Sequence, residues 1–150
     1  MDFKGIFFNI KDYKINKRRR LGKGSFGIVY IAENIKTHEQ FAIKIIDVDN
    51  DFDGDDQMLI MRECSILSKL KHCSIVKYYG ISFRSFEDPS ILQPGIITEY
   101  VSKGSLKSIL DNEKIANAEF DWTSTKKYIN LLGISNAMKY LHKNGILHLD

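Results

Sequence analysis

Hydrophobic and polar positions alternate along the first third of the chain in a way that predicts β-strands. Residues 13–21 lead into a group of glycines, and the stretch 28–31 after them is β-branched and aromatic. A similar run at residues 41–46 follows a polar, turn-like stretch at 33–39. Because β-branched and aromatic side chains favour strands, the pattern predicts three strands with short connections, most simply an antiparallel meander.

The spacing of apolar residues then changes from that of a strand to that of a helix. Apolar side chains within residues 57–70 recur on one side of a helical projection, which predicts an amphipathic helix. Its predicted buried face consists of Leu59, Ile60, Ile66, Leu67 and Leu70.

A turn and two further strands are indicated after this helix. Residues 75–76 and 78–83 suggest the turn and the first of these strands. Both prolines of the chain fall within residues 84–95, which predicts a loop. Residues 96–98 are then expected to form a short strand.

The last third of the chain is predicted to be helical. Ser105 can cap a short helix over residues 106–111. Residues 126–143 have the period of a long amphipathic helix, which Asn144-Gly145 would end. The side chains predicted to point inward from the long helix are Tyr128, Leu131, Leu132, Ala137, Met138 and Leu141.

The composition indicates one soluble globular domain. The chain has 150 residues, enough for a core, and its 43% of hydrophobic residues is ordinary for such a domain. A formal net charge of +3 favours no acidic partner, so no nucleic-acid partner is expected. The two cysteines lack metal-ligand spacing and suit a reducing compartment. Without a signal-peptide pattern or an apolar stretch of roughly 20 residues, a cytoplasmic protein without membrane contact is expected.

Two local clusters of charge depart from this even balance. Lys17-Arg18-Arg19-Arg20 is a basic run, which can bind nucleic acid, although a solvated strand end is the simpler interpretation. Residues 47–56 are rich in aspartate, and Asp49-x-Asp51-x-Asp53-Gly54 matches the first half of a calcium loop. The twelfth position of such a loop needs a bidentate glutamate, and here it is Ile60. A solvated acidic loop is therefore expected.

The glycines form the pattern Gly22-x-Gly24-x-x-Gly27, which occurs in loops that hold phosphates. The pattern also fits a dinucleotide-binding turn, for which Asp47 stands at a suitable distance. Such a turn opens a helix, however, whereas strand-forming residues follow Gly27. The glycines are therefore expected at the tip of a hairpin, where their backbone N–H groups can approach a phosphate chain. A plain glycine-rich hairpin without a ligand is the alternative.

Lys44 is the one charged residue of the predicted strand 41–46, on the face that also carries Ala42 and Ile46. A buried ammonium group costs several kcal/mol unless it has an anionic partner. Glu63 has apolar neighbours one helical turn away on either side, so its carboxylate is predicted to point into the apolar helix face. The two groups are natural partners. The alternative is that Glu63 extends to solvent at the edge of the helix.

Several segments, in a fixed order, resemble the eukaryotic protein kinase domain. They cover the glycine loop, the strand with Lys44, helix C with the turn after it, the gatekeeper and hinge, and helix E running into the catalytic loop. The segments are residues 21–30, 41–44, 62–67, 72–76, 97–101 and 140–150.

The resemblance implies an α+β fold. Residues 12–101 would form the ATP-binding small lobe and hinge, with an antiparallel five-stranded sheet plus helix C. Residues 102–150 would begin the large helical lobe and end inside the catalytic loop. Residues 104–106 and 132–138 are most similar to the tyrosine-kinase-like group of serine/threonine kinases.

The resemblance also assigns roles to single residues. Lys44 would contact the α- and β-phosphates of ATP while Glu63 holds it in place, and Asp150 would accept the proton of the substrate hydroxyl. Thr98 would be the gatekeeper. Leu21, Val29 and Ala42 would enclose the adenine ring, and the backbone of Glu99 and Val101 would bind its edge. The full set expected to bind ATP is Leu21, Gly22, Lys23, Gly24, Ser25, Phe26, Gly27, Val29, Ala42, Lys44, Thr98, Glu99 and Val101.

Two departures from the family pattern limit what these residues are expected to do. Leu149 stands where the family usually has an arginine that pairs with a phosphorylated activation loop. The family's protein ligands for Mg²⁺ would lie beyond residue 150, and Mg²⁺ supplies much of the charge stabilisation in phosphoryl transfer. The 150 residues alone are therefore expected to be inactive.

Two functions follow as alternatives. The first is the ATP-binding portion of a protein kinase that transfers the γ-phosphoryl group of ATP to a serine or threonine hydroxyl of a protein substrate. The second is a non-catalytic, kinase-like module that binds a nucleotide or a partner protein.

Overall fold

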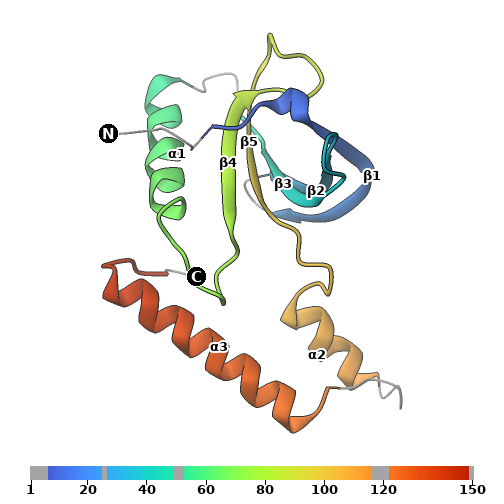
Figure 1. Ribbon diagram of the computed structural model, residues 1–150, viewed down its shortest axis with the longest axis vertical. Coiled ribbons are helices and arrows are strands. Elements are labelled where there is room, and N and C mark those ends of the chain that lie inside the picture. The colour runs from blue at the N-terminus through green and yellow to red at the C-terminus, as the bar shows by residue number, and fades with distance from the viewer. Residues whose placement is uncertain (1–6, 25–26, 49–52, 116–121, 149–150) are drawn as a thin grey trace. The chain divides into compact units, whose positions relative to one another are not determined.

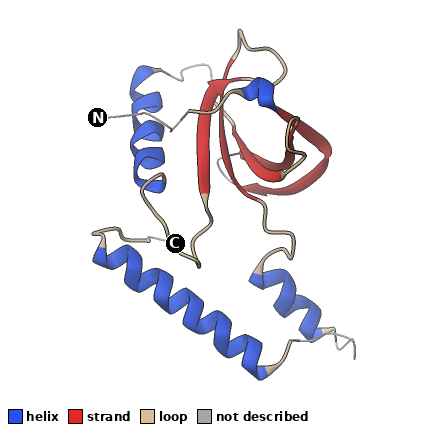
Figure 2. Cartoon of the chain, viewed as in Figure 1, coloured by secondary structure: helices blue, strands red, loops and turns tan. Residues whose placement is uncertain are grey.

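The computed structural model describes residues 7–24, 27–48, 53–115 and 122–148. The chain divides into two compact units. The first holds Met1–Lys71 and Val76–Tyr100, and the second holds His72–Ile75 and Val101–Asp150. Strands lie in the first unit only, as far as the described residues show, and the second is helical there (Figure 2).

The first unit contains an antiparallel sheet of five strands in the order β1-β2-β3-β5-β4 (Figure 1). This confirms the fold class expected from the sequence, including the meander of the first three strands. A short 3-10 helix, η1 (Ile10–Asp12), precedes the sheet. The strands are β1 (Tyr13–Gly24), β2 (Gly27–Asn34), β3 (Gln40–Ile46), β4 (Tyr78–Arg84) and β5 (Leu92–Glu99).

One face of the sheet carries the larger hydrophobic cluster. Phe41, Ile43 and Ile97 are buried there. Aromatic rings pack edge to face on both sides of Phe41, with centroid distances of 5.5 Å to Tyr13 and 4.9 Å to Tyr79. Such ring pairs each stabilise a fold by roughly 0.5–1.5 kcal/mol beyond the area that they bury. This face is the structural core of the unit, so the opposite face is the one available for function.

The opposite face packs against helix α1 (Gly54–Leu67), which lies beside β4 (Figure 1). Cys64 and Ile81 are fully buried in this contact, and Ile60 packs against them. The predicted buried face of the helix was wrong in part, because Leu59 and Ile66 are exposed. The helix has apolar residues on more than one side, so spacing alone could not indicate which side packs on the sheet.

The start of α1 gives part of the acidic stretch a structural role. The carboxylate of Asp53 accepts hydrogen bonds from the backbone N–H groups of Asp55 (2.8 Å) and Asp56 (3.1 Å). Asp56 accepts a bond from the N–H of Asp53 in return, which completes a capping box. This end of the stretch is exposed, as expected, but it forms the cap and first turn of a helix instead of a loop. Asp49 and Asp51 lie outside the described residues.

β5 begins earlier than expected, because it includes Pro94 in what was predicted to be a loop. The register between β4 and β5 shifts from Ser82↔Gly95 to Arg84↔Leu92, so β5 has one extra residue at this point. Proline donates no backbone hydrogen bond and is tolerated in a sheet at such a bulge. Pro94 is fully buried there.

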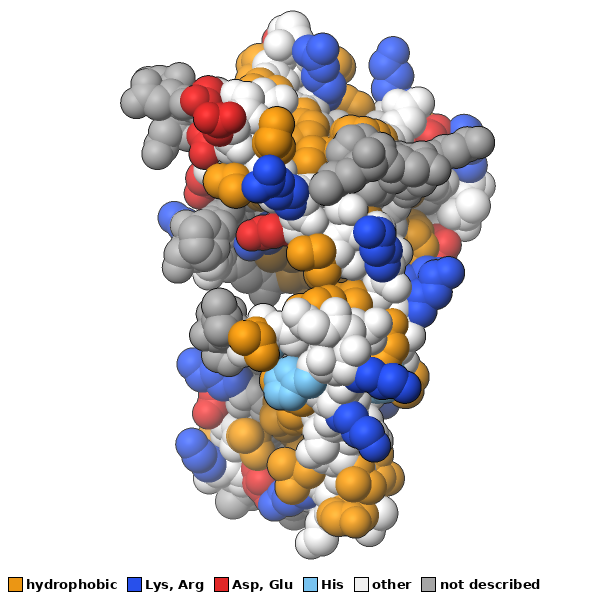
Figure 3. All heavy atoms as spheres, turned by 90° about the vertical axis from the view of Figure 1, so that its left-hand side faces the viewer, with side chains coloured by type: hydrophobic (Ala, Val, Ile, Leu, Met, Phe, Trp, Pro, Cys, Tyr) orange, Lys and Arg blue, Asp and Glu red, His pale blue; other side chains and the backbone are white. Residues whose placement is uncertain are grey.

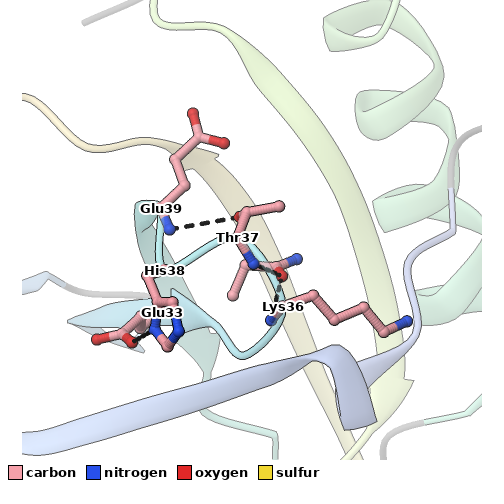
Figure 4. Close-up of polar contacts among 6 residues, drawn as sticks. Glu33, Lys36, Thr37, His38 and Glu39 are labelled. Atoms are coloured by element: carbon pink, nitrogen blue, oxygen red, sulfur yellow. Dashed lines mark hydrogen bonds and ion pairs between the residues drawn. The ribbon is translucent and has the colours of Figure 1, made fainter.

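A polar turn joins β2 to β3 and fixes their register (Figure 4). The side-chain oxygen of Asn34 accepts hydrogen bonds from the N–H groups of Lys36 (2.9 Å) and Thr37 (3.1 Å). His38 has a φ of 59°, and its Nδ1 lies 2.8 Å from Oε1 of Glu33. The turn predicted for residues 33–39 is therefore confirmed, and its side chains set the pairing that places β3.

The second unit contains α2 (Leu106–Lys114) and α3 (Ser124–Lys143). Ser105 caps α2 as expected, by accepting a hydrogen bond from the N–H of Ser108. Gly145, with a φ of 72°, ends α3, and the N–H of Ile146 donates to the carbonyl of Leu141. None of the helices in the described ranges is long and apolar enough to cross a membrane.

Helix α3 buries little of its apolar surface. Ala137 and Leu141 are buried, as predicted, but Tyr128 and Leu131 are more than 60% exposed. Figure 3 shows hydrophobic side chains at the surface of the part of the molecule that contains α3. The predicted inward face is therefore only partly covered in this structure.

Candidate functional site

The glycine pattern lies where β1 and β2 meet. β1 ends at Gly24 and β2 begins at Gly27, and these two residues pair across the hairpin. The predicted hairpin is thus confirmed, and the dinucleotide-binding interpretation fails because a strand follows Gly27 instead of a helix. Ser25 and Phe26, which the sequence also assigns to the site, lie outside the described residues.

The fold requires glycine at one of these positions and not at the other two. Gly27 is buried, has a φ of +136°, and a Cβ added there would lie 2.0 Å from the carbonyl oxygen of Ile45. Its identity is required by the fold. A Cβ added at Gly22 or Gly24 would meet no atom of the described residues within 4 Å. The fold gives no steric reason for glycine at these two positions, so they leave open space above the hairpin for a ligand.

Lys44 lies in one row of residues that crosses four strands of the sheet. In this row Gly22 of β1 pairs with Val29 of β2, Val29 pairs with Lys44 of β3, and Lys44 pairs with Ile96 of β5. Residues paired in this way project from the same face of a sheet. The ammonium group of Lys44 therefore shares a face with the glycine hairpin, and its side chain is half-buried.

A second row extends the same face toward the end of β5. Ala42 pairs with Thr98 and with Ile31. Ala42 and Thr98 are both half-buried, and the hydroxyl of Thr98 donates weakly to the carbonyl oxygen of Glu99 at 3.4 Å. Small side chains at these positions leave room on the face beside Lys44.

Glu99 ends β5 and is tied to the strand beside it. Its backbone N–H donates to the carbonyl of Lys77 at 2.9 Å, and its carboxylate accepts from the N–H of Lys77 at 3.0 Å. These bonds fix the backbone of Glu99 at the end of the sheet. Leu21 is exposed on β1, and Val101, also exposed, belongs to the second unit.

Glu63 is the residue that was expected to pair with Lys44. Its side chain is exposed on α1, and the ion pairs found among the described residues do not join it to Lys44. The neighbouring residue Cys64 is the one that packs on the sheet. The pairing of Lys44 with Glu63 therefore stays a prediction, and Asp150 and Leu149 lie outside the described residues.

Ile96 and Tyr78 also belong to this face, although their sequence positions did not mark them as site residues. Ile96 pairs with Lys44 and also packs against the cluster of Cys64 and Ile81. Burial raises the pKa of Tyr78 above its usual range, and the Cys64 thiol beside it raises it further. Ile96 stands two residues before Thr98, so strand alternation could have placed both side chains on one face.

Comparison with known proteins identifies the family. The protein kinase domain matches residues 15–150, so the chain belongs to the protein kinase domain family. It is 35% identical over 133 residues to the serine/threonine-protein kinase KIC1 of Saccharomyces cerevisiae, covering 87% of this chain and 11% of that protein. It is 32% identical to an Aurora kinase of Yarrowia lipolytica, covering 95% of this chain and 35% of the relative. A MAP3K epsilon protein kinase 2 of Arabidopsis thaliana is 34% identical, covering 87% of this chain and 9% of its own length.

The chain thus spans about a tenth to a third of the length of these relatives. The matched region begins in β1, just before the glycine hairpin. All three relatives are named as kinases, and the name of the first specifies a serine/threonine-protein kinase. The resemblance found in the sequence is therefore confirmed at the level of the family.

Proposed function

We propose that this chain is the ATP-binding portion of a serine/threonine protein kinase. The whole protein would transfer the γ-phosphoryl group of ATP to a hydroxyl group of a protein substrate. The observation that carries the proposal is the row in which Gly22, Val29 and Lys44 pair across three strands. It combines an open glycine backbone, an apolar surface and a cation on one face, as a nucleotide requires.

In this proposal different residues of this face bind different parts of ATP. The backbone N–H groups near Gly22 and Gly24 lie over the phosphate chain, and the Lys44 ammonium binds the α- and β-phosphates. Val29 and Ala42, with Leu21, enclose the adenine ring. Thr98 would limit the depth of the adenine pocket. The backbone of Glu99 and Val101 would bind the adenine edge, as the resemblance implies. The resemblance also adds four residues around the phosphates: Lys23, Ser25, Phe26 and Gly27.

The chemical step needs groups beyond this row. Glu63 is proposed to hold Lys44 when nucleotide is bound. Asp150 is proposed to take the proton of the substrate hydroxyl as its oxygen attacks the γ-phosphorus, while the bond from the γ-phosphorus to the bridging oxygen breaks and ADP leaves. ATP would bind with Mg²⁺, which neutralises phosphate charge. The described residues contain no group of three or more metal-ligating side chains, so no step is assigned to a metal held by them.

The alternative is a kinase-like module that binds a nucleotide or a partner without catalysis. The exposed apolar residues of α3 favour it, because large apolar surfaces often mark interaction sites. The transcript separates the two functions. A reading frame that continues past Asp150 into an asparagine and an Asp-Phe-Gly motif supports the kinase, and a stop codon there supports the module.

The proposal is tested by calorimetric titration of the chain with Mg-ATP. Lys44→Ala removes a charged hydrogen-bond donor to phosphate, so we expect affinity to fall about tenfold or more, given roughly 1.5–3 kcal/mol for such a bond. The control is Lys69→Ala, which removes an exposed lysine after α1. Equal affinities for wild type and Lys44→Ala would remove Lys44 from the site.

A further inference from the structure

The basic run of β1 forms a bulge of three extra residues in the sheet. Asn16 pairs with Ile31 and Arg20 pairs with Tyr30, so a single step along β2 faces four steps along β1. Between Asn16 and Arg20, the residues without a partner in this ladder are Lys17, Arg18 and Arg19. We call these three residues the basic bulge. The bulge places adjacent cations outside the regular alternation of the strand.

The basic bulge is exposed, and most of its charge is not balanced by acids. Lys17 pairs with Glu87, but among the described residues no ion pair is found for Arg18 or Arg19. Arg20 and Lys14, on either side, are likewise exposed, and no ion pair is found for them within the same described ranges. Four cations within seven residues of one strand thus keep their full attraction for an external anion.

A hollow of about 700 Å³ lies against the basic bulge. Ile15 and the buried Ile31 supply apolar surface to its lining, and Asn16 and Gln40 supply amide groups. The one carboxylate in the lining, Glu33, is already held by His38 at 2.8 Å. The residues that line the hollow are Lys14, Ile15, Asn16, Lys17, Arg18, Arg19, Ile31, Glu33 and Gln40.

We propose that the basic bulge and its hollow bind an acidic peptide segment of a partner protein. Carboxylates of the segment would pair with the guanidinium groups of Arg18 and Arg19, whose planar donors match a carboxylate. Backbone amides of the segment would meet Asn16 and Gln40, and a small apolar side chain would contact Ile15. The hollow shares no residue with the set assigned to ATP, so the two sites can be tested separately.

The lining distinguishes a peptide from other polyanions. Single-stranded nucleic acid binds through aromatic side chains on which bases stack, and no aromatic residue lines this hollow. A membrane surface is bound through a protruding apolar or aromatic face together with basic residues, whereas the apolar residues here lie within a hollow. An acidic peptide is the ligand whose charges, amides and size fit all of the groups present.

Fluorescence anisotropy with a labelled octaglutamate peptide tests the proposal. At about 0.1 M salt the peptide should bind, and binding should be lost toward about 1 M salt, where exposed charges are screened. The double variant Arg18→Glu/Arg19→Glu should bind the peptide at least about tenfold more weakly than wild type. The control Lys107→Glu/Lys139→Glu makes the same change of charge at exposed positions of α2 and α3 and should bind like wild type.

Other outcomes would overturn the proposal. They are equal weakening in the two double variants, no binding of octaglutamate to the wild type, or tighter binding of labelled oligothymidine or of phosphatidylserine vesicles than of the peptide. Circular dichroism of both variants shows whether they fold. If Arg18→Glu/Arg19→Glu does not, Arg18→Ala/Arg19→Ala replaces it with the same required outcome. Mg-ATP titration of the variant should match wild type, so that failure of this site is distinguished from failure of the ATP site.

Discussion

Gly27 offers a way to separate what the fold requires from what a ligand requires. In Gly27→Ala the new Cβ would lie 2.0 Å from the carbonyl oxygen of Ile45 and 3.0 Å from the Cα of Ile46. Both contacts are to backbone, so the substitution cannot be relieved by rotating a side chain. The φ of +136° is also one that alanine rarely adopts. The β2–β3 pairing must therefore shift.

The size of the effect follows from these two costs. A backbone held in a strained conformation costs about 1–3 kcal/mol, and overpacking of a well-packed site costs about 1–3 kcal/mol. Gly27→Ala should therefore lower the free energy of unfolding by about 2–6 kcal/mol. This is a large part of the roughly 5–15 kcal/mol that a domain has.

Gly24→Ala is the matched control, because a Cβ at that position meets open space. Alanine there should leave the free energy of unfolding unchanged or raise it by about 0.4–1 kcal/mol, since it restricts the unfolded chain. In urea unfolding, with a slope of about 1–3 kcal/mol per M, Gly27→Ala should move the midpoint down by about 0.7 M or more, and Gly24→Ala should not move it down. The same midpoint for Gly27→Ala and wild type would refute the reasoning.

Two further outcomes follow from other parts of the first and second units. The Cys64 thiol is buried, and burial raises its pKa and keeps it protonated, whereas Cys73 is exposed. Iodoacetamide should therefore alkylate Cys73 at least about tenfold faster than Cys64, as measured by mass spectrometry. Equal rates would show that α1 does not pack as described. Asp53→Ala removes the cap of α1 and should lower the free energy of unfolding by about 1 kcal/mol in urea. Asp88→Ala, in an exposed loop where Ser90 lowers the pKa of the carboxylate, should cost less, and a larger loss there would contradict the assignment of the cap.

The sequence was sufficient for those parts of the site that depend on strand alternation and turn chemistry. Lys44 was expected on the face opposite Phe41, and the structure places Phe41 in the main core and Lys44 on the other face. The hairpin at Gly24 and Gly27 followed from the strand-forming residues after the glycines. In both cases the residues that decide the outcome are neighbours in sequence.

Features that depend on distant parts of the chain were not predictable. The bulge that admits Pro94 into β5 depends on its pairing with β4, and proline alone indicates a loop. The buried side of α1 depends on Ile81 of β4, against which Cys64 packs. The helix has apolar residues on more than one side, so its sequence alone does not indicate which side is buried. The need for glycine at position 27 arises from Ile45 on the next strand, so the glycine pattern alone cannot distinguish Gly27 from Gly22.

An acyl phosphate derivative of ATP gives the most direct test that this face of the sheet holds a nucleotide. The probe transfers its acyl group to a lysine amine held beside the phosphates, since proximity greatly accelerates such a reaction. Mass spectrometry of the labelled chain should find the acyl group on Lys44, and excess Mg-ATP should abolish the labelling. Labelling spread over exposed lysines such as Lys14 and Lys69, without protection by Mg-ATP, would contradict the account.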